Sequence, residues 1–87
     1  MKELYIINLF QDKNYAMRNS EVVLVRTVPA ASSEVASKIV SNHLEIEVTV
    51  NDARKQYGAG EFFATVDKFD VTENGDDVTF KKVPKRR

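Results

Sequence analysis

With 87 residues, 43% of them hydrophobic and 30% charged, the chain is long enough for one small hydrophobic core and too short for a second domain. It has no cysteine, which excludes disulfide bonds, thiolate metal sites and cysteine nucleophiles, and its single histidine excludes a multi-histidine metal site. The formal net charge of zero conceals an asymmetry. Residues 1–80 carry eight Lys or Arg and thirteen Asp or Glu, whereas residues 81–87 carry five cations and no acid, so we expect an acidic body with a basic C-terminal end.

Two apolar segments near the N-terminus predict a pair of strands. Residues 4–10 (LYIINLF) and 21–28 (EVVLVRTV) are rich in β-branched and aromatic side chains and alternate little, which is typical of strands covered on both faces. Residues 11–20 between them are polar and turn-prone. We therefore expect an antiparallel pair joined by a flexible loop.

Residues 32–44 have helical periodicity. Their apolar side chains recur at the spacing of one helix face, which predicts a helix packed on the sheet. The residues of this face are Val35, Ala36, Ile39, Val40 and either His43 or Leu44. Ser32 or Ser33 is expected to cap the N-terminus, and Asn42 and His43 to close the last turn.

Residues 44–50 (LEIEVTV) alternate between apolar and polar side chains, which predicts a third strand with one face in water. The inward residues would be Leu44, Ile46, Val48 and Val50. Residues 51–60 then form a turn-rich connector, in which Arg54, Lys55 and Tyr57 are expected to make a small exposed basic and aromatic group.

The pair Asn74-Gly75 predicts a β-hairpin with a two-residue type I′ turn. The predicted pairs are Glu73 with Asp76, Val71 with Val78, Phe69 with Phe80 and Asp67 with Lys82. The preceding apolar residues from Phe62 to Val66 have the opposite parity from Phe69 and Val71, which predicts a bulge near Asp67 or Lys68.

The full order is ββαβββ, which predicts an α+β fold with a single antiparallel or mixed sheet of about five strands and one helix packed on one face. Residues 1–83 are expected to form this single domain. Residues 84–87 are expected to be a disordered basic tail that begins at Pro84.

Each candidate for chemistry has a simpler interpretation. His43 lacks a serine in a G-x-S-x-G context and is expected to pack or to cap the helix end. Glu45 and Glu47 would lie about 7 Å apart on an exposed strand face, where charge serves solubility. The stretch 70–81 begins like a calcium-binding loop, but Lys81 stands where a bidentate glutamate is required, which leaves a weak cation site as a lesser alternative. We expect no enzymatic activity, no catalytic residue, no metal site and no cofactor.

Two charged groups are the candidate binding sites. The first consists of the acids Asp67, Asp70, Glu73, Asp76 and Asp77, together with Arg54, Lys55 and Tyr57. Such an acidic surface can meet a basic groove on a protein partner. The alternative is a nucleic-acid-binding domain that uses the basic end, Lys81, Lys82, Lys85, Arg86 and Arg87. Against it, no aromatic residue lies among these cations for base stacking. A homodimer through the tail and the hairpin is also compatible with the charges.

In size and layout the chain resembles small phage-encoded accessory proteins: it opens with the strand MKELYII, lacks cysteine, and combines one helix with a sheet that has an acidic face. Many such proteins bind and block a host protein, including nucleic-acid-handling and defence proteins. The resemblance therefore implies a small protein-binding module that acts as an inhibitor. No stretch has the apolar length of a signal peptide or a membrane span, so we expect no membrane association and a cytoplasmic location, in a host cell if the protein is phage-encoded.

Overall fold

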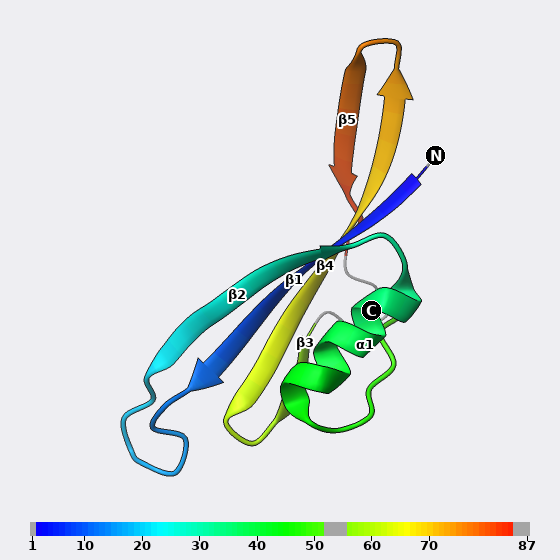
Figure 1. Ribbon diagram of the computed structural model, residues 1–87. Helices are drawn as coiled ribbons and strands as arrows, with labels where there is room; N and C mark the ends of the chain where they lie inside the picture. Colours follow the sequence, from blue (N-terminus) through cyan, green and yellow to red (C-terminus); the bar gives the residue numbers. More distant parts are fainter. Residues whose placement is uncertain (1, 52–55, 85–87) are drawn as a thin grey trace.

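Two long strands, β1 (Lys2–Asp12) and β4 (Phe62–Asn74), form the centre of the sheet in the computed structural model (Figure 1). The structure describes residues 2–51 and 56–84. The other elements are β2 (Val22–Ala30), α1 (Ser33–Leu44), β3 (Gln56–Ala59) and β5 (Asp77–Lys82). The predicted α+β class and the order ββαβββ are confirmed, and every pair in the five-stranded sheet is antiparallel.

The length of β4 allows it to pair with three strands. Along one of its edges β4 pairs with β1, which in turn pairs with β2. The other edge is shared by β3, which pairs with residues 62–65, and by β5, which pairs with residues 69–74. At about 3.4 Å per residue the strand extends about 44 Å, and the molecule is 51 Å long. β4 thus belongs both to the body of the protein and to the hairpin that projects from it.

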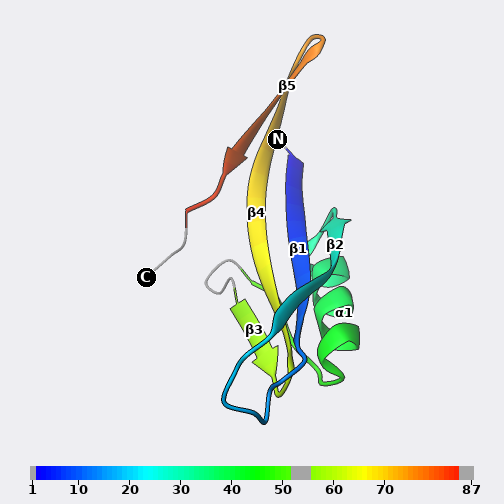
Figure 2. The same cartoon turned by 90° about the vertical axis from the view of Figure 1, so that its left-hand side faces the viewer.

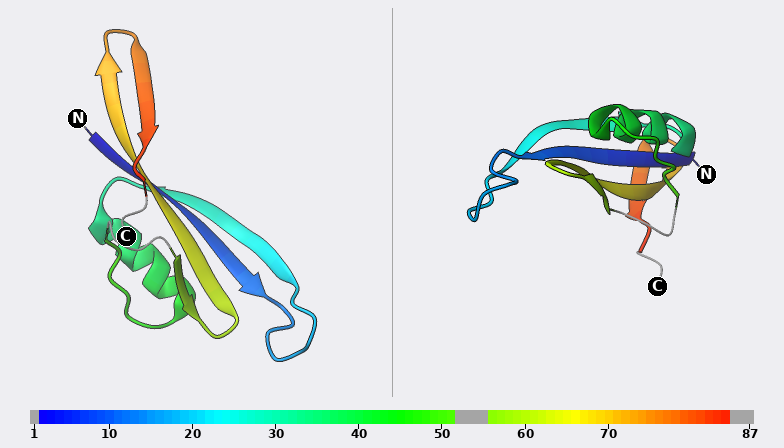
Figure 3. Two further views of the ribbon diagram at one scale, coloured as in Figure 1. Left: turned by 180° about the vertical axis from the view of Figure 1, so that it is seen from behind. Right: turned by 90° about the horizontal axis from the view of Figure 1, so that it is seen from below.

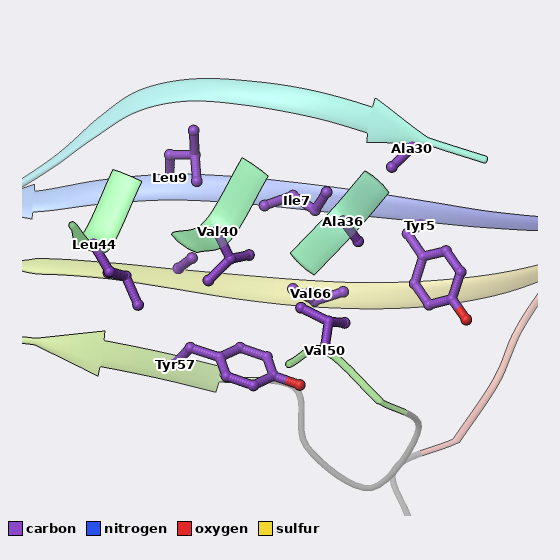
Figure 4. Close-up of a cluster of buried hydrophobic side chains, with 11 residues drawn as sticks. Tyr5, Ile7, Leu9, Ala30, Ala36, Val40, Leu44, Val50, Tyr57 and Val66 are labelled. Carbon is purple, nitrogen blue, oxygen red and sulfur yellow. The ribbon is translucent and has the colours of Figure 1, made fainter. Parts of the chain in front are cut away.

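Figure 2 and Figure 3 show α1 against one face of the sheet, and the hydrophobic core lies between the two. Figure 4 shows how alternate side chains of β1 and β4 point towards the helix, because strand residues alternate between two faces. The buried residues are Tyr5, Ile7, Leu9, Ala30, Ala36, Val40, Leu44, Val50, Tyr57, Ala64 and Val66. The core is therefore one-sided, and the opposite face of the sheet has no helix on it in the described part of the chain.

Local signals set both ends of α1. The Ser32 hydroxyl accepts a hydrogen bond from the Val35 amide at 3.2 Å, as expected for an N-cap, and Glu34 lies in the positively polarised first turn. The helix ends at Leu44, and the C-cap residue Glu45 that follows it adopts a left-handed conformation with φ 59°. Within the described residues, no helix combines the length and apolarity needed to cross a bilayer.

The predicted strand at residues 44–50 is wrong. Leu44 is the last residue of α1, and the segment that follows is not in a strand. Ser41 Oγ accepts a bond from the Val48 amide at 2.9 Å and donates to the Val48 carbonyl at 3.0 Å, while Ser37 Oγ accepts from the Val50 amide at 2.8 Å. These side chains satisfy the backbone groups that a strand would pair, so the segment packs along the helix, and β3 takes its place in the sheet.

The bulge predicted near Asp67 or Lys68 is also absent, because β1 and β4 pair in one continuous register. The parity change in the sequence has another cause. Ala64 and Val66 face α1, whereas Phe69 and Val71 lie on the opposite face, beyond the reach of the helix. The register shift in the sheet lies instead between β1 and β2, at Leu9/Phe10.

The hairpin turn is displaced by one residue from its predicted position. Asn74 pairs with Asp77, so the turn consists of Gly75 and Asp76, and Gly75 has a φ of +63° that favours glycine. The observed cross-strand pairs include Val71 with Phe80, Phe69 with Lys82 and Glu73 with Val78. The partners differ from the prediction by two residues, an even number, so the predicted apolar face of the hairpin is retained.

Candidate protein-binding surface

The distal part of β4 and all of β5, residues 69–82, form an arm that extends away from α1 (Figure 1, Figure 2). Among the described helices and strands, β5 contacts β4 alone. All six residues of β5 are exposed. Beyond Val71, where the pairing with β1 ends, the arm is a two-stranded ribbon, which contributes little to the core and presents its side chains to other molecules.

The arm carries apolar side chains on the face opposite α1. Val78 is 50% exposed and Phe80 is 58% exposed. Since directly opposed residues of an antiparallel pair point to the same face, they lie beside Val71 and Phe69, which are half-buried. This strip is not needed to close the core, which lies on the other face of the sheet. It is a surface that a second molecule could cover.

The predicted acidic residues lie on or beside this arm, in three different settings. Asp67 pairs with Lys82 (Oδ1 to Nζ, 3.4 Å), and Glu73 pairs with Lys2 (Oε1 to Nζ, 3.2 Å). Asp70 lies opposite Lys81 in the β4–β5 ladder. Asp76 and Asp77 are exposed at the tip and form no ion pair with a described residue. The negative charge of the arm is therefore concentrated at its tip.

Tyr57, which was predicted to be exposed in the connector, is buried instead. Tyr57 is only 5% exposed and belongs to the core, where its hydroxyl accepts a hydrogen bond from the Asn51 amide at 3.2 Å. Its ring cannot contact a partner, because β3 turns it towards α1. Arg54 and Lys55 lie outside the described residues.

The basic end is divided between the hairpin and the tail. Lys81 and Lys82 are residues of β5, and the pairing of Lys82 with Asp67 neutralises part of their charge. Lys85, Arg86 and Arg87, the cations of the predicted tail, lie outside the described residues. Pro84 is exposed and follows the end of β5. Lys81 and Lys82 thus balance acidic residues of the hairpin itself and are also exposed to any partner.

The face of the sheet opposite α1 carries a second feature that the sequence did not reveal. Phe10 and Phe63 stack with ring centroids 5.0 Å apart. Beside them, Asn8 bridges Thr27 at 2.8 Å and Thr65 at 3.3 Å across three strands. Asn8, a polar residue within the apolar segment 4–10, is the feature of the sequence that could have indicated this ladder. It indicates a water-facing sheet surface rather than a second core.

The described part of the chain has no group of three or more His, Asp or Glu placed to hold a metal ion. His43 Nε2 donates to the Phe10 carbonyl at 2.7 Å, and its ring meets Phe62 edge-on. It therefore packs the helix end, as its position predicts. Glu45 and Glu47 are exposed, but outside a strand, so the predicted strand face does not bring them together.

The loop between β1 and β2 is organised by Asp12. Its carboxylate accepts hydrogen bonds from the Ser20 hydroxyl at 2.6 Å, the Glu21 amide at 2.9 Å and the Asn14 amide at 3.1 Å. The Ser20 bond, followed by the Glu21 bond, lowers the pKa of Asp12 below its ordinary value of 3.8. The loop also exposes Tyr15. Asp12 has a structural role that its sequence context did not reveal.

Comparison with protein-family models, curated proteins and solved structures finds no match to this chain. The structure groups Glu73, Asp76 and Asp77 with Val78 and Phe80 on the arm and separates Tyr57 from them. The arm is therefore the surface from which a function can be inferred.

Proposed function

We propose that this protein is a small non-enzymatic protein-binding module that contacts its partner through the projecting arm, residues 69–82. The observation that supports this most strongly is the exposure of Val78 and Phe80 on an arm whose tip is acidic. Apolar side chains next to charged ones are the usual composition of a binding site, in which burial supplies affinity and charge supplies orientation.

The charges specify the kind of partner. Asp76 and Asp77 lie at the exposed tip, and Glu73 lies on the same face as Val78. A partner with an apolar pocket rimmed by Lys or Arg would complement this arrangement, and the acidic tip would increase the association rate at low salt. A nucleic-acid-binding groove has such a rim. In this role the protein would be a cytoplasmic inhibitor of the phage type, blocking a host nucleic-acid-handling or defence protein.

The test is an affinity capture with tagged full-length protein, with and without nuclease and at two salt concentrations. The arm variant is Val78→Ser with Phe80→Ser, and the matched control is Val35→Ser with Ile46→Ser, which changes two apolar residues exposed elsewhere. We expect a protein that is captured by the wild type and the control, survives nuclease, and is lost with the arm variant. Circular dichroism verifies that each variant is folded.

Equal capture by the arm variant and the control would rule out the arm as the contact surface. Charge reversal of Asp70, Glu73, Asp76 and Asp77 together should slow association, and an unchanged rate would remove the acidic tip from the proposal. The alternative, nucleic-acid binding by the tail, predicts recovery of nucleic acid that disappears with nuclease, with salt and on deletion of Lys85, Arg86 and Arg87.

A further inference from the structure

The outer edge of β5 has an unused set of backbone hydrogen-bonding groups. Residues of an antiparallel ladder alternate between those that bond to the neighbouring strand and those that point away from it. The Val83 amide donates to the Lys68 carbonyl of β4 at 2.8 Å, so the odd-numbered residues of β5 bond inwards. The backbone groups of Val78 and Phe80 therefore point outwards, and no other strand in the described part of the chain pairs with this edge.

The sequence along this edge is complementary to itself. Residues 76–82 read DDVTFKK, with two acids at one end, two cations at the other and Thr79 in the middle. A second copy of the strand, antiparallel and centred on Thr79, places Val78 opposite Phe80 on the apolar face. It also places Asp77 opposite Lys81 and brings Asp76, in the turn just before the strand, towards Lys82. Opposite charges and apolar pairs both stabilise such a ladder.

Geometry restricts the register of such a pair. Directly opposed residues of an antiparallel pair point to the same face of the sheet. When the two strands are identical and related by a twofold axis, this condition is met only if the axis lies between one residue and its own copy. Centring the pair on Val78 or on Phe80 instead removes both kinds of charge pair. With Thr79 at the centre, Val78 and Phe80 use the outward-pointing backbone groups for hydrogen bonds.

We propose that β5 pairs edge to edge with β5 of a second copy of this chain, antiparallel about Thr79, so that two sheets join into one. The pairing covers an exposed strand edge, which is otherwise open to non-specific strand pairing. The apolar strip of the arm remains accessible, because edge pairing uses the backbone and leaves the face free. This dimer goes beyond the proposed function and does not depend on it.

The absence of cysteine provides a direct test of the register. Thr79 and its copy form the non-hydrogen-bonded pair at the twofold axis. Cβ atoms of such a pair lie about 4.5 to 5.5 Å apart, close to the separation that a disulfide accepts. Thr79→Cys should therefore form a disulfide-linked dimer at least tenfold faster than Thr72→Cys. Thr72 is the matched control, because it is exposed and lies opposite Thr79 within the same hairpin.

Sedimentation of the purified full chain tests the dimer without a cross-link. We expect a monomer–dimer equilibrium, and Asp77→Lys should weaken it by roughly tenfold, because both symmetry-related pairs with Lys81 become repulsive. Glu21→Lys makes the same charge change at an exposed residue outside β5 and should leave it unchanged. A monomer at every concentration, or equal cross-linking of the two cysteine variants, would overturn the proposal. The purified chain contains no other protein, so the outcome of these two experiments does not depend on the outcome of the capture experiment.

Discussion

Val71 of β4 lies directly opposite Phe80 of β5, on the face of the sheet that α1 does not cover. Because Phe80 is 58% exposed, this contact adds little to the stability of the fold. We expect Phe80→Ala to lower the free energy of unfolding by less than about 1 kcal/mol, the upper range for a cross-strand pair. Urea denaturation measures the change. A loss comparable with that of a core truncation would show that the arm is part of the core.

The core itself should respond differently to the same kind of change. Ile7 is fully buried beneath α1, whereas Ile46 is 49% exposed. Ile7→Ala should therefore lower the free energy of unfolding by about 2 to 5 kcal/mol, through lost burial and a residual cavity. Ile46→Ala removes the same atoms from the surface and is its control. Similar urea midpoints for the two variants would contradict the one-sided core.

Ser41 should be more important than an ordinary helix-surface residue. Its hydroxyl makes hydrogen bonds with both the amide and the carbonyl of Val48. Ser41→Ala leaves these half-buried groups without that partner, so we expect a loss of about 1 to 3 kcal/mol and faster amide exchange at Val48. Lys38→Ala, an exposed change on the same helix, is the control. Equal stability of the two variants would show that residues 46–50 are held by other contacts.

Glu45 is a residue whose replacement by glycine should stabilise the protein. Its φ of 59° costs a non-glycine residue about 1 to 2 kcal/mol, while glycine costs about 0.5 to 1 kcal/mol in chain entropy. Glu45→Gly is therefore expected to raise the free energy of unfolding by about 0.5 to 1 kcal/mol. Glu47→Gly, at an exposed position without a positive φ, should have the opposite effect. Thermal denaturation distinguishes the two.

Acid should loosen the loop between β1 and β2. The folded-state pKa of Asp12 is lowered by its bonds to Ser20 and Glu21, so its contribution to stability is complete well above pH 3.8 and is lost as the pH falls through the lowered pKa. The Glu21 amide resonance should report this titration below pH 3.8 in NMR spectra. In the Asp12→Asn variant the Glu21 amide resonance should no longer shift with pH in this range. A titration that persists in this variant would assign the effect to another carboxylate.

Much of the candidate site was present in the sequence, but its geometry was not. The acidic residues and the apolar face of the hairpin follow from composition and alternation, and the even shift in register left that face intact. The exposure of Phe80 could not be predicted, because it depends on which face of the sheet α1 covers. Tyr57 was misplaced for the same reason: a short strand between two loops carries no local sign of which face it turns to the core.

The sequence by itself determined the elements whose signals are local. α1 follows from its periodicity and its Ser32 cap, and β1 and β2 from their β-branched residues, because helix caps and side-chain periodicity act over a few residues. Only the tertiary structure decided that residues 45–50 remain outside the sheet, and that β4 changes the face that carries its apolar side chains. Alternation shows which residues share a face, but a strand also needs an edge to bond to. The backbone of residues 48–50 is instead bound by Ser37 and Ser41 of the helix.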